Sequence, residues 1–86
     1  MTDDLQKIIK HYGEDAQLIQ VIEEMSELTK EITKYYKGAD TTEQIKEEMA
    51  DVLLMFEQLF IMTGISHADV MQIMYQKLQR TMERIK

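Results

Sequence analysis

The sequence contains no cysteine and no proline, and only three of its 86 residues are glycine. The lack of cysteine excludes disulfide bonds and thiolate metal sites, and it gives no support to a secreted, disulfide-stabilised fold. Because β-rich domains need many turns built on glycine and proline, the scarcity of these two residues favours a few long helices. The length allows one small domain, residues 1–86. Such a domain buries only ~60–65% of its unfolded surface and would be marginally stable as a monomer.

Basic residues and long apolar runs are also scarce. Ten lysines and arginines are outnumbered by sixteen aspartates and glutamates, and the net charge is −6. This charge argues against nucleic acid or an anionic membrane as an electrostatic partner. The longest uninterrupted apolar run, Val52 to Phe56, is far shorter than the ~20 residues of a membrane span. The acidic start does not resemble a signal peptide, so we expect a cytoplasmic protein that binds neither nucleic acid nor membrane.

Hydrophobic periodicity predicts one short and three long helices. They are expected over residues 3–12, 14–37, 41–63 and 66–85, with a glycine in each turn between them. Thr41 followed by Gln44, and Ser66 followed by Asp69, have the spacing of side-chain caps at helix starts. Since the turns are short, consecutive long helices should be antiparallel neighbours. The predicted fold is therefore an all-α helical bundle of one short and three long helices.

The third of these helices is apolar nearly all round, with only three polar residues from Met49 to Met62. Such a helix must be covered on several sides, and two other long helices cover about two of them. The simplest cover for the remaining side is another subunit, which would bury Leu54, Met55 and Ile61. We therefore expect a homo-oligomer, a dimer or a tetramer, and the alternative is that the short first helix fills the gap.

Two neighbouring predicted helices each carry a pair of acidic residues three positions apart. Glu24 and Glu27 flank the apolar stripe of the second helix, and Glu48 and Asp51 flank that of the third. Folding the two helices back on each other places the pairs within ~6 Å along the bundle axis. Four converging carboxylates form an oxygen-rich site that suits Mg²⁺ or Mn²⁺ rather than zinc. The alternative interpretation is a solvated acidic face.

The last predicted helix carries a matching basic stripe. Lys77, Arg80 and Arg84 lie on one edge of it, where they could hold phosphate oxygens. Cations near a helix C-terminus are also favoured by the helix dipole alone, which is the simpler interpretation. The two histidines, His11 and His67, lie at helix ends and are expected to be ordinary polar residues.

The acidic segments resemble a known signature. Residues 23–28, EEMSEL, and residues 47–54, EEMADVLL, are similar to the E-E-x-x-E-L … E-x-x-D-V-L-L pattern of the MazG-like nucleotide pyrophosphohydrolases. These belong to the all-α NTP pyrophosphatases, together with dimeric dUTPases and phosphoribosyl-ATP pyrophosphatases. The resemblance extends from about residue 13 to residue 84.

The resemblance implies a bundle that assembles as a dimer or a dimer of dimers. It also implies Mg²⁺-dependent cleavage of a nucleoside triphosphate to a monophosphate and pyrophosphate. The positions that match the family's metal ligands are Glu24, Glu27, Glu48 and Asp51. A metal-activated water is then the nucleophile, and Glu23 or Glu47 is a candidate base.

Further positions match the family less closely. Gln17 falls where related proteins have a glutamine ahead of the acidic pair. Lys77 and Arg84 match a K-x-x-x-N-x-x-R pattern in which Thr81 replaces the asparagine, so the recognition of base and sugar is left open.

The predicted function is hydrolysis of (d)NTPs, with removal of non-standard nucleotides as one role. Two alternatives stay open. One is a related dUTP or phosphoribosyl-ATP pyrophosphatase. The other is a non-enzymatic acidic helical module that uses its eight methionines for adaptable protein contacts.

Overall fold

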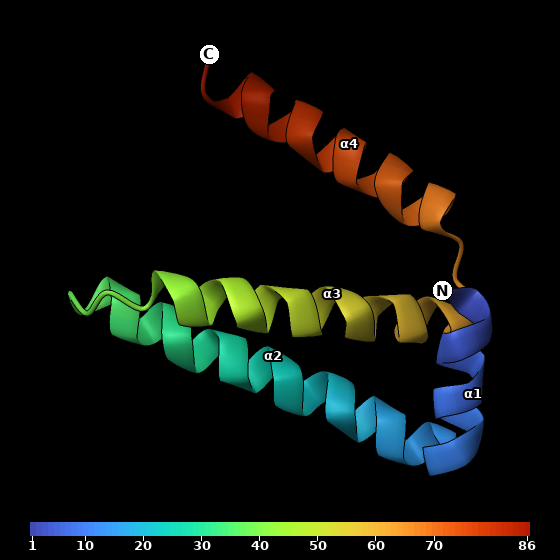
Figure 1. Ribbon diagram of the computed structural model, residues 1–86. Coiled ribbons are helices and arrows are strands. Elements are labelled where there is room, and N and C mark those ends of the chain that lie inside the picture. The colour runs from blue at the N-terminus through green and yellow to red at the C-terminus, as the bar shows by residue number, and fades with distance from the viewer.

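The computed structural model describes all 86 residues as four helices without strands (Figure 1). The helices are α1 (Thr2–Tyr12), α2 (Glu14–Tyr36), α3 (Thr42–Thr63) and α4 (His67–Arg84). The predicted all-α class is confirmed, as are the number of helices and their bounds to within one residue. No single helix is long and apolar enough to cross a membrane, and α3 and α4 reach that length and composition only as a pair bent by 118°.

The two predicted helix caps have different outcomes. The Ser66 side chain accepts a hydrogen bond of 3.2 Å from the backbone N–H of Asp69, so the cap of α4 is confirmed. The predicted cap at Thr41 is wrong, because this side chain makes no cap hydrogen bond. Instead, the buried Thr41 hydroxyl donates to the carbonyl oxygen of Glu31 at 2.8 Å. This bond fastens the α2–α3 turn to the end of α2.

Helices α2 and α3 form an antiparallel hairpin, and α1 packs across the end where α2 begins and α3 ends (Figure 1). Only seven of the 86 residues are buried. They are Leu5, Gln17, Val21, Thr41, Val52, Met55 and Gln58. Contact between α1 and α3 confirms part of the alternative considered above, in which the first helix covers α3. Met55 is already buried within its own chain, with 7% of its surface exposed, so the prediction that it is buried between subunits is wrong.

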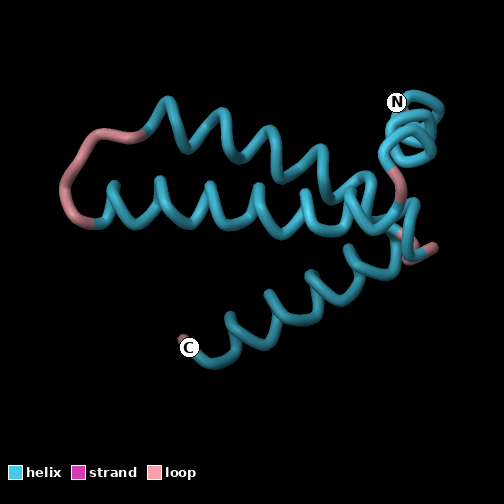
Figure 2. Tube along the Cα trace, turned by 90° about the horizontal axis from the view of Figure 1, so that it is seen from below, coloured by secondary structure: helices cyan, strands magenta, loops and turns pink.

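Helix α4 departs from the predicted bundle. The chain turns by 118° between α3 and α4, and α4 has no buried residue. Both views show α4 diverging from the hairpin toward its C-terminus (Figures 1 and 2). The prediction that α4 packs on the hairpin as an antiparallel neighbour is therefore wrong. Its apolar residues instead stay exposed, among them Met71, Met74, Tyr75, Leu78 and Met82.

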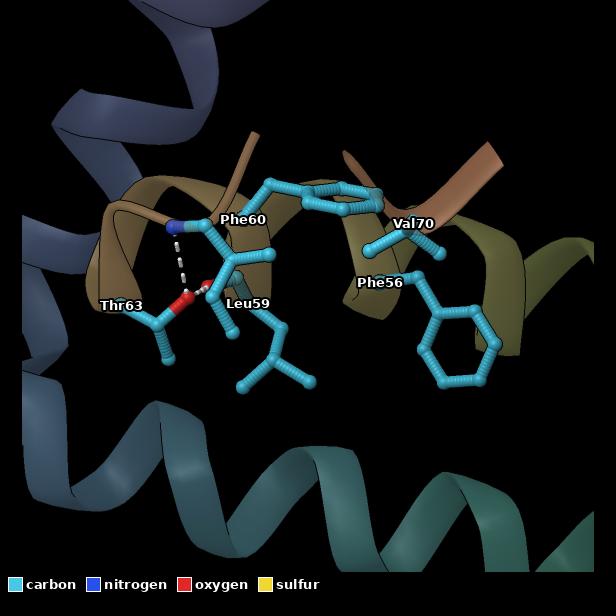
Figure 3. A pocket seen from close by; sticks show the side chains of 6 residues that line it. Phe56, Leu59, Phe60, Thr63 and Val70 are labelled. Atoms are coloured by element: carbon cyan, nitrogen blue, oxygen red, sulfur yellow. Dashed lines mark hydrogen bonds between the residues drawn. The ribbon is translucent and has the colours of Figure 1, made fainter. Parts of the chain in front are cut away.

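Contacts near the turn hold the start of α4. The His67 Nε2 atom lies 2.8 Å from Glu57 Oε2, and the His67 ring stacks on Phe60 with 3.8 Å between centroids. Beside them is an apolar cavity of about 210 Å³. Figure 3 shows Phe56, Phe60 and Val70 around it, with the Thr63 hydroxyl accepting from Ile65 N–H at 3.2 Å.

The hairpin has two unlike edges. On each helix, acidic residues recur at helical spacing on one side of the buried stripe and apolar residues recur on the other side. The acidic edge consists of Glu24, Glu27, Glu31, Glu48 and Asp51. The apolar edge consists of Met25, Ile32, Met49, Leu53 and Phe56, which are between 36% and 60% exposed. Helix α4 begins on the apolar side, where Val70 and Phe56 line the same cavity. Figure 2 shows α1 and α4 on opposite sides of the hairpin.

Candidate metal centre

Three carboxylates from two helices meet on the acidic edge. Glu24 of α2 and Glu48 and Asp51 of α3 each have an oxygen within 4.8 Å of the others. Glu24 and Glu48 are half-buried and Asp51 is exposed, so the group sits at the rim of the α2–α3 seam. This spacing lets a single cation contact all three residues.

Two further acidic residues lie close by. Glu27 and Glu31 both act on the carboxyl group of Glu48 through their charge, although neither belongs to the group of three. The sequence predicted that Glu27 converges with Glu24, Glu48 and Asp51. The structure brings together the last three without Glu27. Glu31 was not among the predicted site residues, and the signal that could have found it is its position seven residues after Glu24, on the same helix face.

Burial and repulsion disfavour ionisation of the central carboxylate. Partial burial contributes most to raising the pKa of Glu48 above its ordinary 4.5, followed by the charges of Asp51, Glu24, Glu27 and Glu31. The Oε2 atom of Glu48 is buried and accepts no hydrogen bond. A buried carboxylate oxygen without a donor is unfavourable unless a proton or a cation satisfies it.

The edge has little compensating positive charge. No lysine, arginine or histidine forms an ion pair with Glu24, Glu27, Glu48 or Asp51. The one hydrogen bond to this set comes from Gln20 Nε2, which donates to Glu24 Oε1 at 2.7 Å and orients that carboxylate. An all-oxygen, uncompensated donor set with a buried free oxygen fits a hard divalent cation such as Mg²⁺ or Mn²⁺.

The other predicted site residues are not gathered at this cluster. Gln17 is 7% exposed and lies two helical turns before Glu24, covered within the chain. Glu23 and Glu47 are exposed and make no hydrogen bond or ion pair, so neither is distinguished as a base. Their roles stay predictions.

The basic stripe is also separate from the carboxylates of its own chain. Lys77, Arg80 and Arg84 are exposed and form no ion pair. They belong to α4, which leaves from the apolar side of the hairpin and diverges from it (Figures 1 and 2). The expectation that α4 lies against the acid-bearing helices of the same chain is therefore wrong.

Comparison with known proteins identifies one family. A family model described as the MazG nucleotide pyrophosphohydrolase domain matches residues 13–85. The match runs from the glycine before α2 to the residue that follows α4, and it includes every carboxylate of the acidic edge. Neither curated proteins nor solved structures give a match.

Proposed function

This chain belongs to the MazG nucleotide pyrophosphohydrolase family, and we propose that it is a Mg²⁺-dependent hydrolase of nucleoside triphosphates. The products would be a (deoxy)nucleoside monophosphate and pyrophosphate, with non-standard nucleotides as candidate substrates. The observation that carries the proposal is the convergence of Glu24, Glu48 and Asp51 within 4.8 Å, without a basic partner, inside the matched domain.

The carboxylates have the chemistry that this reaction requires. A divalent cation bound there would neutralise phosphate charge and acidify the attacking water. Glu24, Glu48 and Asp51 would hold the cation, with Glu27 next to them. Because Asp51 is exposed and the cluster lies at the rim of the seam, a phosphate chain can approach it from solvent.

We propose that the chain works as a homo-oligomer, a dimer or a tetramer. Leu53, Leu54 and Met49 on α3 are 60%, 42% and 50% exposed, and the apolar residues of α4 are also uncovered. Exposed apolar surface on this scale is typical of a protein–protein interface. A second copy is the occupant that presents matching apolar faces from its own α3 and α4.

Assembly would also bring basic groups to the substrate. Since α4 diverges from its own acidic edge, we propose that Lys77, Arg80 and Arg84 reach the phosphates bound on the acidic edge of a second copy. There they would stabilise the leaving pyrophosphate through charge-assisted hydrogen bonds.

The test is pyrophosphate release from a panel of canonical and modified (d)NTPs, including dUTP, and from phosphoribosyl-ATP. We expect Mg²⁺-dependent release by the wild-type protein and none by Asp51→Asn, whose circular dichroism should be unchanged. Glu43→Gln is the matched control, because Glu43 is exposed on α3 and paired with Lys46 at 2.9 Å, away from the acidic edge. Equal turnover by Asp51→Asn and Glu43→Gln would refute the site. The preferred nucleotide would separate a general (d)NTP pyrophosphohydrolase from a dUTP or a phosphoribosyl-ATP pyrophosphatase.

A further inference from the structure

We propose that Gln20 is a positioning residue of the metal centre, whose side-chain amide holds the carboxylate of Glu24 in place for the cation. The inference rests on the proposed metal-dependent function. It assigns a role to a residue that was not among the predicted site residues.

The contact between the two side chains is short and partly shielded from solvent. Gln20 Nε2 donates to Glu24 Oε1 at 2.7 Å, and both residues are half-buried. They lie one helical turn apart on the same face of α2. Glu24 is also one of the three residues whose carboxylate oxygens lie within 4.8 Å of one another. The amide therefore restrains one member of this group from within its own helix.

A neutral amide is suited to this role. A carboxylate offers about four lone-pair sites on its two oxygens, and the hydrogen bond from Gln20 occupies one of them, on Oε1. The other sites stay available to a cation. A lysine in this position would cancel the charge that attracts the metal, whereas the amide orients the carboxylate and leaves its charge intact. Carboxylates that bind metals are commonly held by hydrogen bonds of this kind.

The chain contains an internal comparison for this contact. Residues 20–27, QVIEEMSE, and residues 44–51, QIKEEMAD, share a glutamine four positions before the first site carboxylate. In α3, however, Gln44 is exposed and donates nothing to Glu48, whose Oε2 atom is buried without a hydrogen bond. The same residue at the same spacing thus makes the bond on one helix only. Spacing alone does not produce the contact, so the surroundings of Glu24 contribute to it.

The simpler interpretation is that the bond only supports α2. Glutamine and an acidic residue four positions apart stabilise a helix slightly, whether or not a metal is bound. A helix-supporting role would change the stability of the metal-free protein. A positioning role would change the affinity for the cation instead, and the two effects can be measured separately.

The experiment is Mn²⁺ titration of the metal-free protein by calorimetry at pH 7, without nucleotide. Gln20→Met removes the donor and keeps an unbranched side chain of similar helix propensity. We expect it to bind Mn²⁺ about 10- to 100-fold more weakly than the wild type, the loss typical when a metal-binding side chain loses its hydrogen-bond partner. Gln44→Met is the matched control and should stay within twofold of the wild type. Thermal melts without metal should give the same Tm for all three proteins.

Gln20→Ala removes the same donor and is the second variant, which serves if Gln20→Met fails to fold. Wild-type affinity in the folded Gln20 variant, with binding lost in Asp51→Asn, would overturn the role of Gln20 and leave the metal centre standing. Equal weakening in Gln44→Met would also overturn it, as would a lowered Tm of the metal-free Gln20 variant that accounts for the weaker binding. If the wild type itself binds no Mn²⁺, the proposed metal-dependent function fails together with the role of Gln20.

Discussion

Truncation of Leu53 at the apolar edge should dissociate the protein. Leu53 is 60% exposed in the single chain and lies between Met49 and Leu54 on the uncovered side of α3. Complete burial of a leucine contributes about 1.5–3 kcal/mol, so covering the exposed part is worth about 1–2 kcal/mol per copy. A twofold interface counts each substitution twice, which gives about 2–4 kcal/mol per dimer for Leu53→Ala. At about 1.4 kcal/mol per tenfold, the dissociation constant should rise about 30- to 700-fold.

Sedimentation velocity over a range of protein concentrations measures this shift. Tyr12→Ala is the control, because Tyr12 is 64% exposed but belongs to α1, on the opposite side of the hairpin from α4 (Figure 2). We expect Tyr12→Ala to sediment like the wild type and Leu53→Ala to dissociate at concentrations where the wild type does not. A wild-type protein that is a folded monomer at micromolar concentration would refute the reasoning, as would equal dissociation of the two variants.

Two further predictions concern charge. The raised pKa of Glu48 means that the folded protein binds its proton more tightly than the unfolded chain does. The contribution of Glu48 to the stability of the metal-free protein should therefore be complete below about pH 4.5. It should be lost as the pH rises through the raised pKa. Thermal melts should show that Glu48→Gln loses this dependence, and an unchanged pH profile in that variant would contradict the assignment. Lys77→Ala and Arg80→Ala should each lower kcat/KM for a triphosphate by ~10- to 150-fold at saturating Mg²⁺, the loss expected for one charge-assisted hydrogen bond. Unchanged kinetics with a lowered Tm would instead leave these residues with a helix-dipole role only.

The sequence was a good guide to features with a local cause. Helix bounds follow from periodicity and from turn residues such as Gly64, whose φ of 72° lies in the left-handed region that glycine adopts most readily. The convergence of Glu24, Glu48 and Asp51 was also predictable, because a short turn forces α2 and α3 to be antiparallel and so sets their register. The burial of one oxygen each of Glu31 and Glu48 was not, since it depends on which rotamers the packed seam allows.

The direction of α4 was not predictable from periodicity. A regular apolar stripe indicates that Met74 and Leu78 need a partner, but it does not say whether that partner is in the same chain. In this chain the hairpin is contacted by α4 only near the turn, and the rest of the stripe is exposed. The assumption that consecutive helices pair failed because the contacts of His67 with Glu57 and Phe60, at one end of α4, do not determine where a helix of 18 residues points.

Because α4 is attached at one end only, a small rotation at the turn moves its other end a long way. Its 18 residues span about 27 Å, so a rotation of about 10° at the turn would move its far end by about 5 Å. The rotation would be centred on the contacts of His67 with Glu57 and Phe60, and the basic side chains lie toward the opposite end of α4. A change of one side chain in these contacts would therefore displace Arg84, near the far end of α4, by a distance comparable to the size of a phosphate group.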